Sequence, residues 1–425
     1  MALPKAKLDA AEALLAAYSK PEGTAWFSNA VSHAEQRLLD MGGPIKRDEY
    51  WKYTDPSSLV ATSNDKAFQA TSSDLSVAVD NADAVLMENG QIDGDIPQIA
   101  GCEIDTISKA RAADIHWAKD LYGQLEAEGQ KPVHRPLAAL NAARAADGLA
   151  IHVTGQATQS LYIKHTHAAG ASVDTMAHHI VKVDSGAEAT LIEELDDFGR
   201  SNIVWEIDVA EGGSLHMIRI QAPHHDVVRS SAVFARLGKE STYKALTVSV
   251  NGAFARNENV IWFTGDDANA TVAGAAAGYG SDFHHDDTVF VTHDAVNCES
   301  RQVFKKVLRN KATGVFQGKI LVEPDAQKTD GYQISQGLLL DDDSQFLAKP
   351  ELEIYADDVA CSHGSTVGAI DQNAVFYLTS RGVPRSEAVN MLVLAFLGEA
   401  IDEVEDDDLA EMLRERLADW MSPVN

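Results

Sequence analysis

The pattern of apolar and polar positions changes twice along this chain of 425 residues. Residues 1–147 show mainly helical spacing, residues 148–368 show short β-rich runs, and residues 369–425 return to helical spacing. The two patterns differ because side chains repeat about every 3.6 residues on a helix and about every 2 residues on a strand. We therefore expect an N-terminal mainly helical region, a β core and a C-terminal helical domain.

The N-terminal region combines helical stripes with one aromatic segment. Apolar side chains recur on one helical face from Trp26 to Leu39, and Gly42-Gly43-Pro44 ends that pattern as a helix stop does. Residues 47–54 mix charges with three aromatic rings, which predicts a segment whose rings pack while its charges stay in water. A further helix is predicted from Leu137 to Ala146.

The central region consists of closely spaced β-rich runs separated by turn residues such as Asp184-Ser185-Gly186 and Asn251-Gly252. More than 200 residues of this kind without a helical pattern indicate one large all-β unit, which is a sandwich, a barrel or a solenoid. No strict sequence repeat decides among the three. The predicted runs are Leu161 to Ile163, Ile203 to Val209, Leu215 to Ile220, Tyr243 to Val250, Val260 to Phe263, Thr288 to Thr292, Val315 to Val322 and Leu352 to Tyr355.

The C-terminal region predicts three helices. The first runs from about Asn373 to Ser380, the second follows Gly382-Val383-Pro384, and the third begins after Asp406-Asp407-Asp408, whose charges suit a helix N-terminus. Apolar stripes on these helices fit two roles: covering one face of the β unit or docking a partner.

Composition narrows the class of protein. With 45% hydrophobic and 23% charged residues, the chain is that of an ordinary globular protein. Its formal charge of −29 argues against binding to nucleic acid or to an anionic membrane surface. No uninterrupted apolar run approaches the length of a membrane span, so we expect a cytoplasmic protein.

The three cysteines, Cys102, Cys298 and Cys361, form no C-x-x-C pair and fit reduced thiols better than a disulfide framework. Cys361 and His363 are the most informative pair, because residues two apart on a strand face the same side. A thiolate and an imidazole suit iron, zinc or copper, although a closed structural site usually takes four ligands. The plain alternative is a buried thiol beside a hydrogen-bonded histidine.

Histidine doublets in the β region offer a competing hypothesis, a cupin-like metal centre in an enzyme. They are His178-His179, His224-His225 and His284-His285, with His293 nearby. Adjacent residues on a strand face opposite sides, so each doublet supplies at most one inward imidazole. The sequence has no G-x-x-x-x-G-K-[ST] loop, H-E-x-x-H or G-x-S-x-G motif, which disfavours nucleotide hydrolysis and the commonest hydrolases.

Several motifs taken together resemble the SufB/SufD family of iron–sulfur cluster assembly proteins. Cys361-Ser362-His363-Gly364 favours the SufD branch over the SufB branch, and Trp51-Lys52-Tyr53-Thr54 also matches SufD. The matching segments are residues 317–320, 326–333, 338–340, 349–354, 361–364 and 376–382.

The resemblance implies a mainly β fold: a right-handed parallel β-helix core flanked by N-terminal and C-terminal helical regions. It implies a non-catalytic scaffold subunit that pairs with a SufB-like subunit and binds a SufC-like ATPase through its C-terminal helical domain. His363, with Cys361 as a second candidate, would contribute to a nascent iron–sulfur cluster that is transient and shared with the SufB-like subunit. No permanently bound cofactor is expected on the isolated chain.

The same residues also fit two alternative functions. One is a SufB-like homodimer that binds the whole cluster, and the scarcity of cysteines speaks against it. The other is a β-helical or cupin-like metalloenzyme acting on a small molecule. An exposed sheet edge that pairs with a partner can also pair with itself, so a homodimer is one possible state of the isolated chain.

Overall fold

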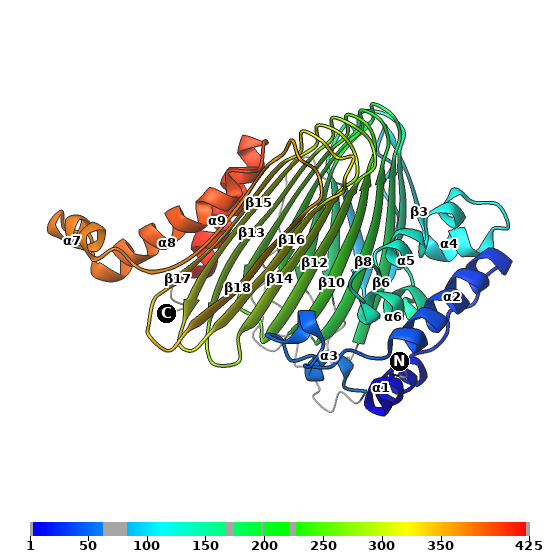
Figure 1. Ribbon diagram of the computed structural model, residues 1–425, viewed down its shortest axis with the longest axis horizontal. Helices are drawn as coiled ribbons and strands as arrows, with labels where there is room; N and C mark the ends of the chain where they lie inside the picture. Colours follow the sequence, from blue (N-terminus) through cyan, green and yellow to red (C-terminus); the bar gives the residue numbers. More distant parts are fainter. Residues whose placement is uncertain (1–2, 63–82, 167–173, 197–198, 222–226, 422–425) are drawn as a thin grey trace.

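The computed structural model describes residues 3–62, 83–166, 174–196, 199–221 and 227–421. Helical segments lie at both ends of the chain, and strands fill the middle (Figure 1). The N-terminal helices are α1 (Lys5–Ala17), α2 (Ala25–Met41), η1 (Glu49–Trp51), α3 (Ser57–Val60), α4 (Ile107–Ala112), η2 (Trp117–Asp120), α5 (Gln124–Glu128) and α6 (Pro136–Arg144). The C-terminal helices are α7 (Gln372–Ser380), α8 (Arg385–Ile401) and α9 (Asp407–Met421).

The described strands form two sheets of ten and nine strands. The first sheet holds β1 (Asp83–Glu88), β2 (Gln91–Asp93), β5 (Leu161–Thr166), β7 (Glu188–Asp196), β9 (Ser214–Gln221), β11 (Thr242–Val250), β13 (Asn269–Tyr279), β15 (Glu299–Arg309), β17 (Asp330–Leu339) and β19 (Ala360–Ala369). The second holds β3 (Cys102–Thr106), β4 (Leu149–Val153), β6 (Asp174–Val183), β8 (Arg200–Val209), β10 (Val228–Leu237), β12 (Phe254–Phe263), β14 (His284–His293), β16 (Thr313–Val322) and β18 (Gln345–Ile354).

From β4 onward the chain alternates between the two sheets, and each strand from β6 to β17 pairs in parallel with the strands two positions before and two positions after it. We call the nine-stranded sheet, which holds β4, β6 and the later even-numbered strands, the even-numbered sheet, and the ten-stranded sheet the odd-numbered sheet. This topology is a parallel β-solenoid of two facing sheets (Figure 1). The mainly β fold with flanking helices is therefore confirmed. Each of the eight β-rich runs predicted from the sequence lies in one of these strands, although the last run extends past the end of β18.

Coils of the solenoid vary in length. The coil that leads from Val228 to its partner Phe254 is shorter than the coil that leads from Thr313 to its partner Gln345. The turns at one edge are nevertheless stacked by backbone hydrogen bonds. Asn297 and Lys328 have positive φ angles, and their amides donate to Gln327 O at 2.9 Å and Asp358 O at 2.5 Å in the next turn.

The N-terminal region contains strands that its helical pattern did not predict. β1 pairs with β5 in parallel, and β3 pairs with β4 antiparallel. Val85 and Met87 of β1 are fully buried in the core between the sheets. Along the chain, the first strand of the solenoid therefore comes before helices α4, α5 and α6.

Helices cover the outer faces of both sheets. On the even-numbered sheet, Phe27 of α2 and Leu125 of α5 belong to a core that includes Phe234 of β10. On the odd-numbered sheet, Leu397 of α8 packs in a core that includes Val303 of β15. Figure 1 shows the two helical groups near opposite ends of the stack of strands, with α7 extending beyond the sheets.

The aromatic segment predicted to anchor the N-terminal region does so on the even-numbered sheet. Trp51 is 5% exposed, and the guanidinium of Arg256 lies 4.2 Å from its ring centroid. Thr54 donates to Asp286 Oδ2 at 2.5 Å, and Arg256 also pairs with Asp286. Tyr50 reaches further, because its hydroxyl donates to Glu351 Oε2 of β18 at 2.6 Å. The segment thus ties the N-terminal region to a strand of the terminal coil.

Ionisable side chains interrupt the apolar interior between the sheets. Lys306 Nζ lies 2.7 Å from His285 Nδ1 and 2.7 Å from Asp287 Oδ2, and all three residues are at most 3% exposed. His293 stacks on Phe263 and lies 2.9 Å from Ser300 Oγ. Burial lowers the pKa of His285 to about 4 and that of His293 to about 3, because the imidazolium form loses hydration.

The buried histidines predict that stability falls in mild acid. In the unfolded chain these groups bind protons near pH 6.5, but in the folded chain only near pH 4 and 3. The unfolded state therefore binds more protons between these values, so the free energy of unfolding should fall as the pH drops from about 6.5 to about 5, by up to about 1.4 kcal/mol per pH unit for each group. Urea unfolding at several pH values measures this slope. His293→Gln should make the slope shallower, whereas exposed His33→Gln should not, and equal slopes would contradict the assignment.

Candidate functional site at the open end of the solenoid

Cys361 and His363 lie on β19, the last strand of the odd-numbered sheet. Parallel pairing with β17 places Cys361 opposite Gly331 and His363 opposite Gln333. The face they share also carries Ser365, whose Oγ lies 2.7 Å from Ser335 Oγ of β17. The two-residue spacing thus places the thiol and the imidazole on one face of the strand, as the sequence predicted.

The environment of Cys361 keeps its thiol protonated. The side chain is half-buried against an apolar cluster that includes Ile320 and Leu352. Gly331 provides the room, because a Cβ there would lie 3.1 Å from the Cys361 Sγ. Burial raises the pKa of the Cys361 thiol, so a thiolate at this position requires a nearby positive charge such as a metal ion.

His363 is exposed, and so is most of β19. In the described part of the chain, no strand pairs with the outer edge of β19 or of β18. Exposed apolar side chains flank this edge, including Val367 at 55% and Tyr355 at 58% exposure. An unpaired strand edge with apolar neighbours is a surface that readily accepts another chain.

The pair does not form a complete metal site within this chain. Among the described residues, neither Cys361 nor His363 belongs to a group of three or more converging ligand side chains. Cys102 is half-buried at the other end of the solenoid, and Cys298 is fully buried in the core. Burial raises the pKa of Cys298 to about 11. A metal site built on these two side chains would therefore need further ligands from another molecule.

The histidine doublets behave as strand alternation predicts. His179 points into the interior and stacks on Trp205, whereas His178 points outward and lies 2.6 Å from Glu206 Oε1. Likewise His285 faces the interior, while His284 lies 3.0 Å from Thr54 Oγ1 on the outer side. His224 and His225 lie outside the described residues.

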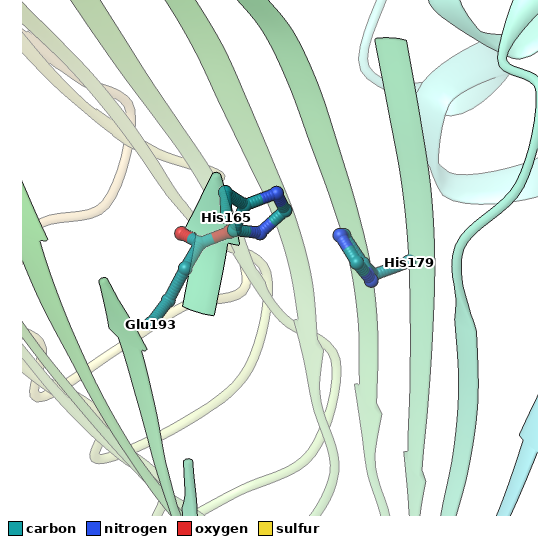
Figure 2. Close-up of side chains that lie close together, drawn as sticks. All are labelled: His165, His179 and Glu193. Carbon is teal, nitrogen blue, oxygen red and sulfur yellow. The ribbon is translucent and has the colours of Figure 1, made fainter. Parts of the chain in front are cut away.

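One group of potential metal ligands does converge, near the N-terminal end of the interior. His165, His179 and Glu193 are buried, and their ligand atoms lie within 4.8 Å of one another (Figure 2). They come from β5, β6 and β7. No sequence pattern singles out His165 or Glu193, because which residues of different strands lie side by side depends on the length of each coil.

Hydrogen bonds already use both carboxylate oxygens of Glu193 and one ring nitrogen of His179. Glu193 accepts from Trp205 Nε1 at 3.0 Å through Oε1 and from Arg219 Nε at 2.6 Å through Oε2. His179 Nδ1 accepts from the amide of Leu149 at 3.1 Å, which leaves the proton of the neutral ring on Nε2. A dication here would also face the buried Arg219 guanidinium. With both Glu193 oxygens in use and a guanidinium beside them, the cluster fits a buried Glu193–Arg219 ion pair better than a metal centre, and it does not support the metalloenzyme hypothesis.

This polar network predicts a structural role for Glu193. Glu193→Gln should destabilise the fold by roughly 3–5 kcal/mol, because it leaves the charge of Arg219 buried without a counter-ion. Urea unfolding measures the loss, with exposed Glu188→Gln on the same strand as the matched control. A chelator should leave the unfolding midpoint of the wild-type protein unchanged. A lower midpoint with chelator would instead identify a bound metal.

Comparison with known proteins assigns the chain to a family. The domain described as "SUF system FeS cluster assembly, SufBD core domain" matches residues 165–396. The chain is 28% identical over 416 residues to the iron–sulfur cluster assembly protein SufD of Escherichia coli, covering 93% of each chain. It is 30% identical over 255 residues to a SufBD family protein of Synechocystis, covering 56% of this chain and 54% of that one. None of the described helices combines the length and apolar character needed to cross a bilayer. The chain belongs to the SufB/SufD family of iron–sulfur cluster assembly proteins, as a member of the SufD type.

Proposed function

We propose that this chain is a non-catalytic scaffold subunit that pairs with a SufB-type subunit through the open edge of β18 and β19. In this role His363 and Cys361 contribute ligands to a nascent iron–sulfur cluster, which is the product of the assembly and not a resident cofactor. The observation that carries the proposal is a thiol and an imidazole on one face of a strand whose outer edge is unpaired among the described strands.

The electrostatics of the pair fit transient binding. Because burial raises the pKa of Cys361, the thiol is protonated when no metal is present, and metal binding must release that proton. The remaining ligands would come from the SufB-type subunit, which makes the cluster dependent on the complex. A site completed only between two chains can also be opened when the chains move apart.

The C-terminal helices support a second contact, with a SufC-type ATPase. Phe376 and Tyr377 of α7 are 74% and 56% exposed, and Met391 of α8 is 48% exposed. Large apolar side chains this exposed on projecting helices are typical of docking surfaces. The sequence has no phosphate-binding loop of its own, so ATP hydrolysis would be supplied by that subunit.

The cluster site is tested by co-expressing this chain with the SufB-type and SufC-type proteins of its own organism. His363→Ala should leave the mass of the complex unchanged and lower its iron and sulfide content by roughly tenfold or more, as loss of a ligand contact does. Ser362→Ala, which changes the adjacent residue on the opposite face of β19, is the matched control. Normal iron and sulfide content in the His363 variant would mean that this histidine is not a ligand.

The docking surface is tested by Phe376→Ser combined with Tyr377→Ser. The double variant should lose co-purification with the ATPase and retain the SufB-type subunit, while its unfolding midpoint stays the same because both side chains are exposed. Ile115→Ser, which removes an 87% exposed apolar side chain in the N-terminal region, serves as control. Full retention of the ATPase by the double variant would exclude α7 as the docking element.

A further inference from the structure

A row of polar side chains leads from the interior to His363. Gln302 of β15 pairs in register with Gln333 of β17, and Gln333 pairs in register with His363 of β19. Neighbouring strands lie about 4.8 Å apart, and residues opposite each other face the same side of a sheet. The three side chains therefore stand next to one another on one face, with His363 at the open end.

The Gln333 amide has one hydrogen-bonding group in use and one that is not. Its Nε2 donates to Gln302 Oε1 at 2.8 Å. Its Oε1 is buried and has no hydrogen-bond partner among the described residues. Gln333 itself is 0% exposed, so water does not reach this acceptor freely. A buried carbonyl oxygen without a donor destabilises the fold, and such an atom calls for a physical explanation.

The surrounding sequence makes space for this amide. Gly318 of β16 lies on the facing sheet, and a Cβ at that position would be 2.2 Å from Gln333 Nε2. Any side chain at 318 would therefore displace the amide. Phe304 follows Gln302 on the same face of β15 and packs against Phe316, with ring centroids 4.9 Å apart. Phe304 therefore lies between Gln302 and Lys306 along β15.

We propose that Gln333 is a positioning residue for His363: its Oε1 accepts the N–H of the imidazole and thereby fixes which ring nitrogen keeps its lone pair. Neighbouring strands put the imidazole within reach when it turns toward β17. The other ring nitrogen is then unprotonated and directed away from the strand. A second hydrogen bond of this kind orients most histidines that bind metals. The consequence for cluster assembly rests on the proposed function, but the hydrogen bond itself does not.

The hydrogen bond is tested on the isolated chain by the ¹⁵N chemical shifts of the two His363 ring nitrogens, at a pH where the ring is neutral. The signals are assigned by their absence from His363→Asn. In the wild type one tautomer should dominate. Gln333→Glu keeps an acceptor and should strengthen the same preference, whereas Gln333→Met should move the chemical shifts toward those of a mixture of tautomers. Ser335→Ala, on the same strand and face, should change neither shift.

A merely structural role for Gln333 would not produce opposite effects in the Glu and Met variants. Equal His363 shifts in the wild type and in Gln333→Met would overturn the proposal. If Gln333→Glu fails to fold, the comparison of the wild type, Gln333→Met and Ser335→Ala still decides, with thermal unfolding as the check on folding.

The consequence for assembly is measured in the co-expressed complex. Gln333→Met should lower iron and sulfide content by roughly tenfold, in the range found for residues that orient metal ligands, and Gln333→Glu should retain most of it. If the tautomer shifts but neither Gln333→Met nor His363→Ala changes cluster content, the proposed function fails and the hydrogen bond stands. If His363→Ala abolishes the cluster while Gln333→Met changes neither tautomer nor content, the positioning role is wrong.

Discussion

Pairing of each coil with the next is the interaction on which this structure depends. From β6 to β17, each strand has parallel partners on both edges, supplied by the coils before and after it. The turn amides follow the same rule, since Lys328 donates to Asp358 of the last turn. A stack of this kind has an unavoidable end, where β18 and β19 keep one edge unpaired among the described strands. At the beginning of the stack, antiparallel strands pair with the first strands of both sheets and N-terminal helices pack nearby. The last coil has no such cover among the described residues.

Buried ion pairs in the interior suit a structural role, whereas the exposed side chains at the open end are accessible to a ligand or a partner. Deep in the core, charged groups are neutralised by partners at fixed distances, as Arg219 is by Glu193 at 2.6 Å. Such pairs resist change, because separating them would leave a charge without hydration. The last strand of the odd-numbered sheet differs in being accessible: His363 is exposed, and Gln333 on the neighbouring strand keeps an acceptor unused among the described residues. An exposed imidazole is a group that a second chain or a metal can reach and bind.

The sequence predicted the helices and strands better than it predicted which of their side chains lie close together. The eight β-rich runs and the C-terminal helices lie where the periodicity placed them, because burial leaves a local pattern, and strand geometry alone related Cys361 to His363. The solenoid was not evident from spacing, since coils of unequal length blur the repeat, and β1 enters the core only through its pairing with the distant β5. Glu193 and Gln333 carried no comparable signal, because their partners lie on other coils. For the Glu193 cluster, residue types alone suggest a metal centre. Only its hydrogen bonds show that both Glu193 oxygens and one nitrogen of His179 are in use.

An open coil with only two candidate soft ligands suits the role in cluster assembly that we propose. A closed site with four protein ligands in one chain would hold metal tightly, because the preformed geometry favours the bound state. Cys361 and His363 supply at most half of such a set, and the raised pKa of the thiol opposes binding until a positive charge is present. In the proposed function, affinity at this position therefore depends on a second chain. Separation of the two chains would remove half of the ligands at once, so release requires no change inside the rigid solenoid.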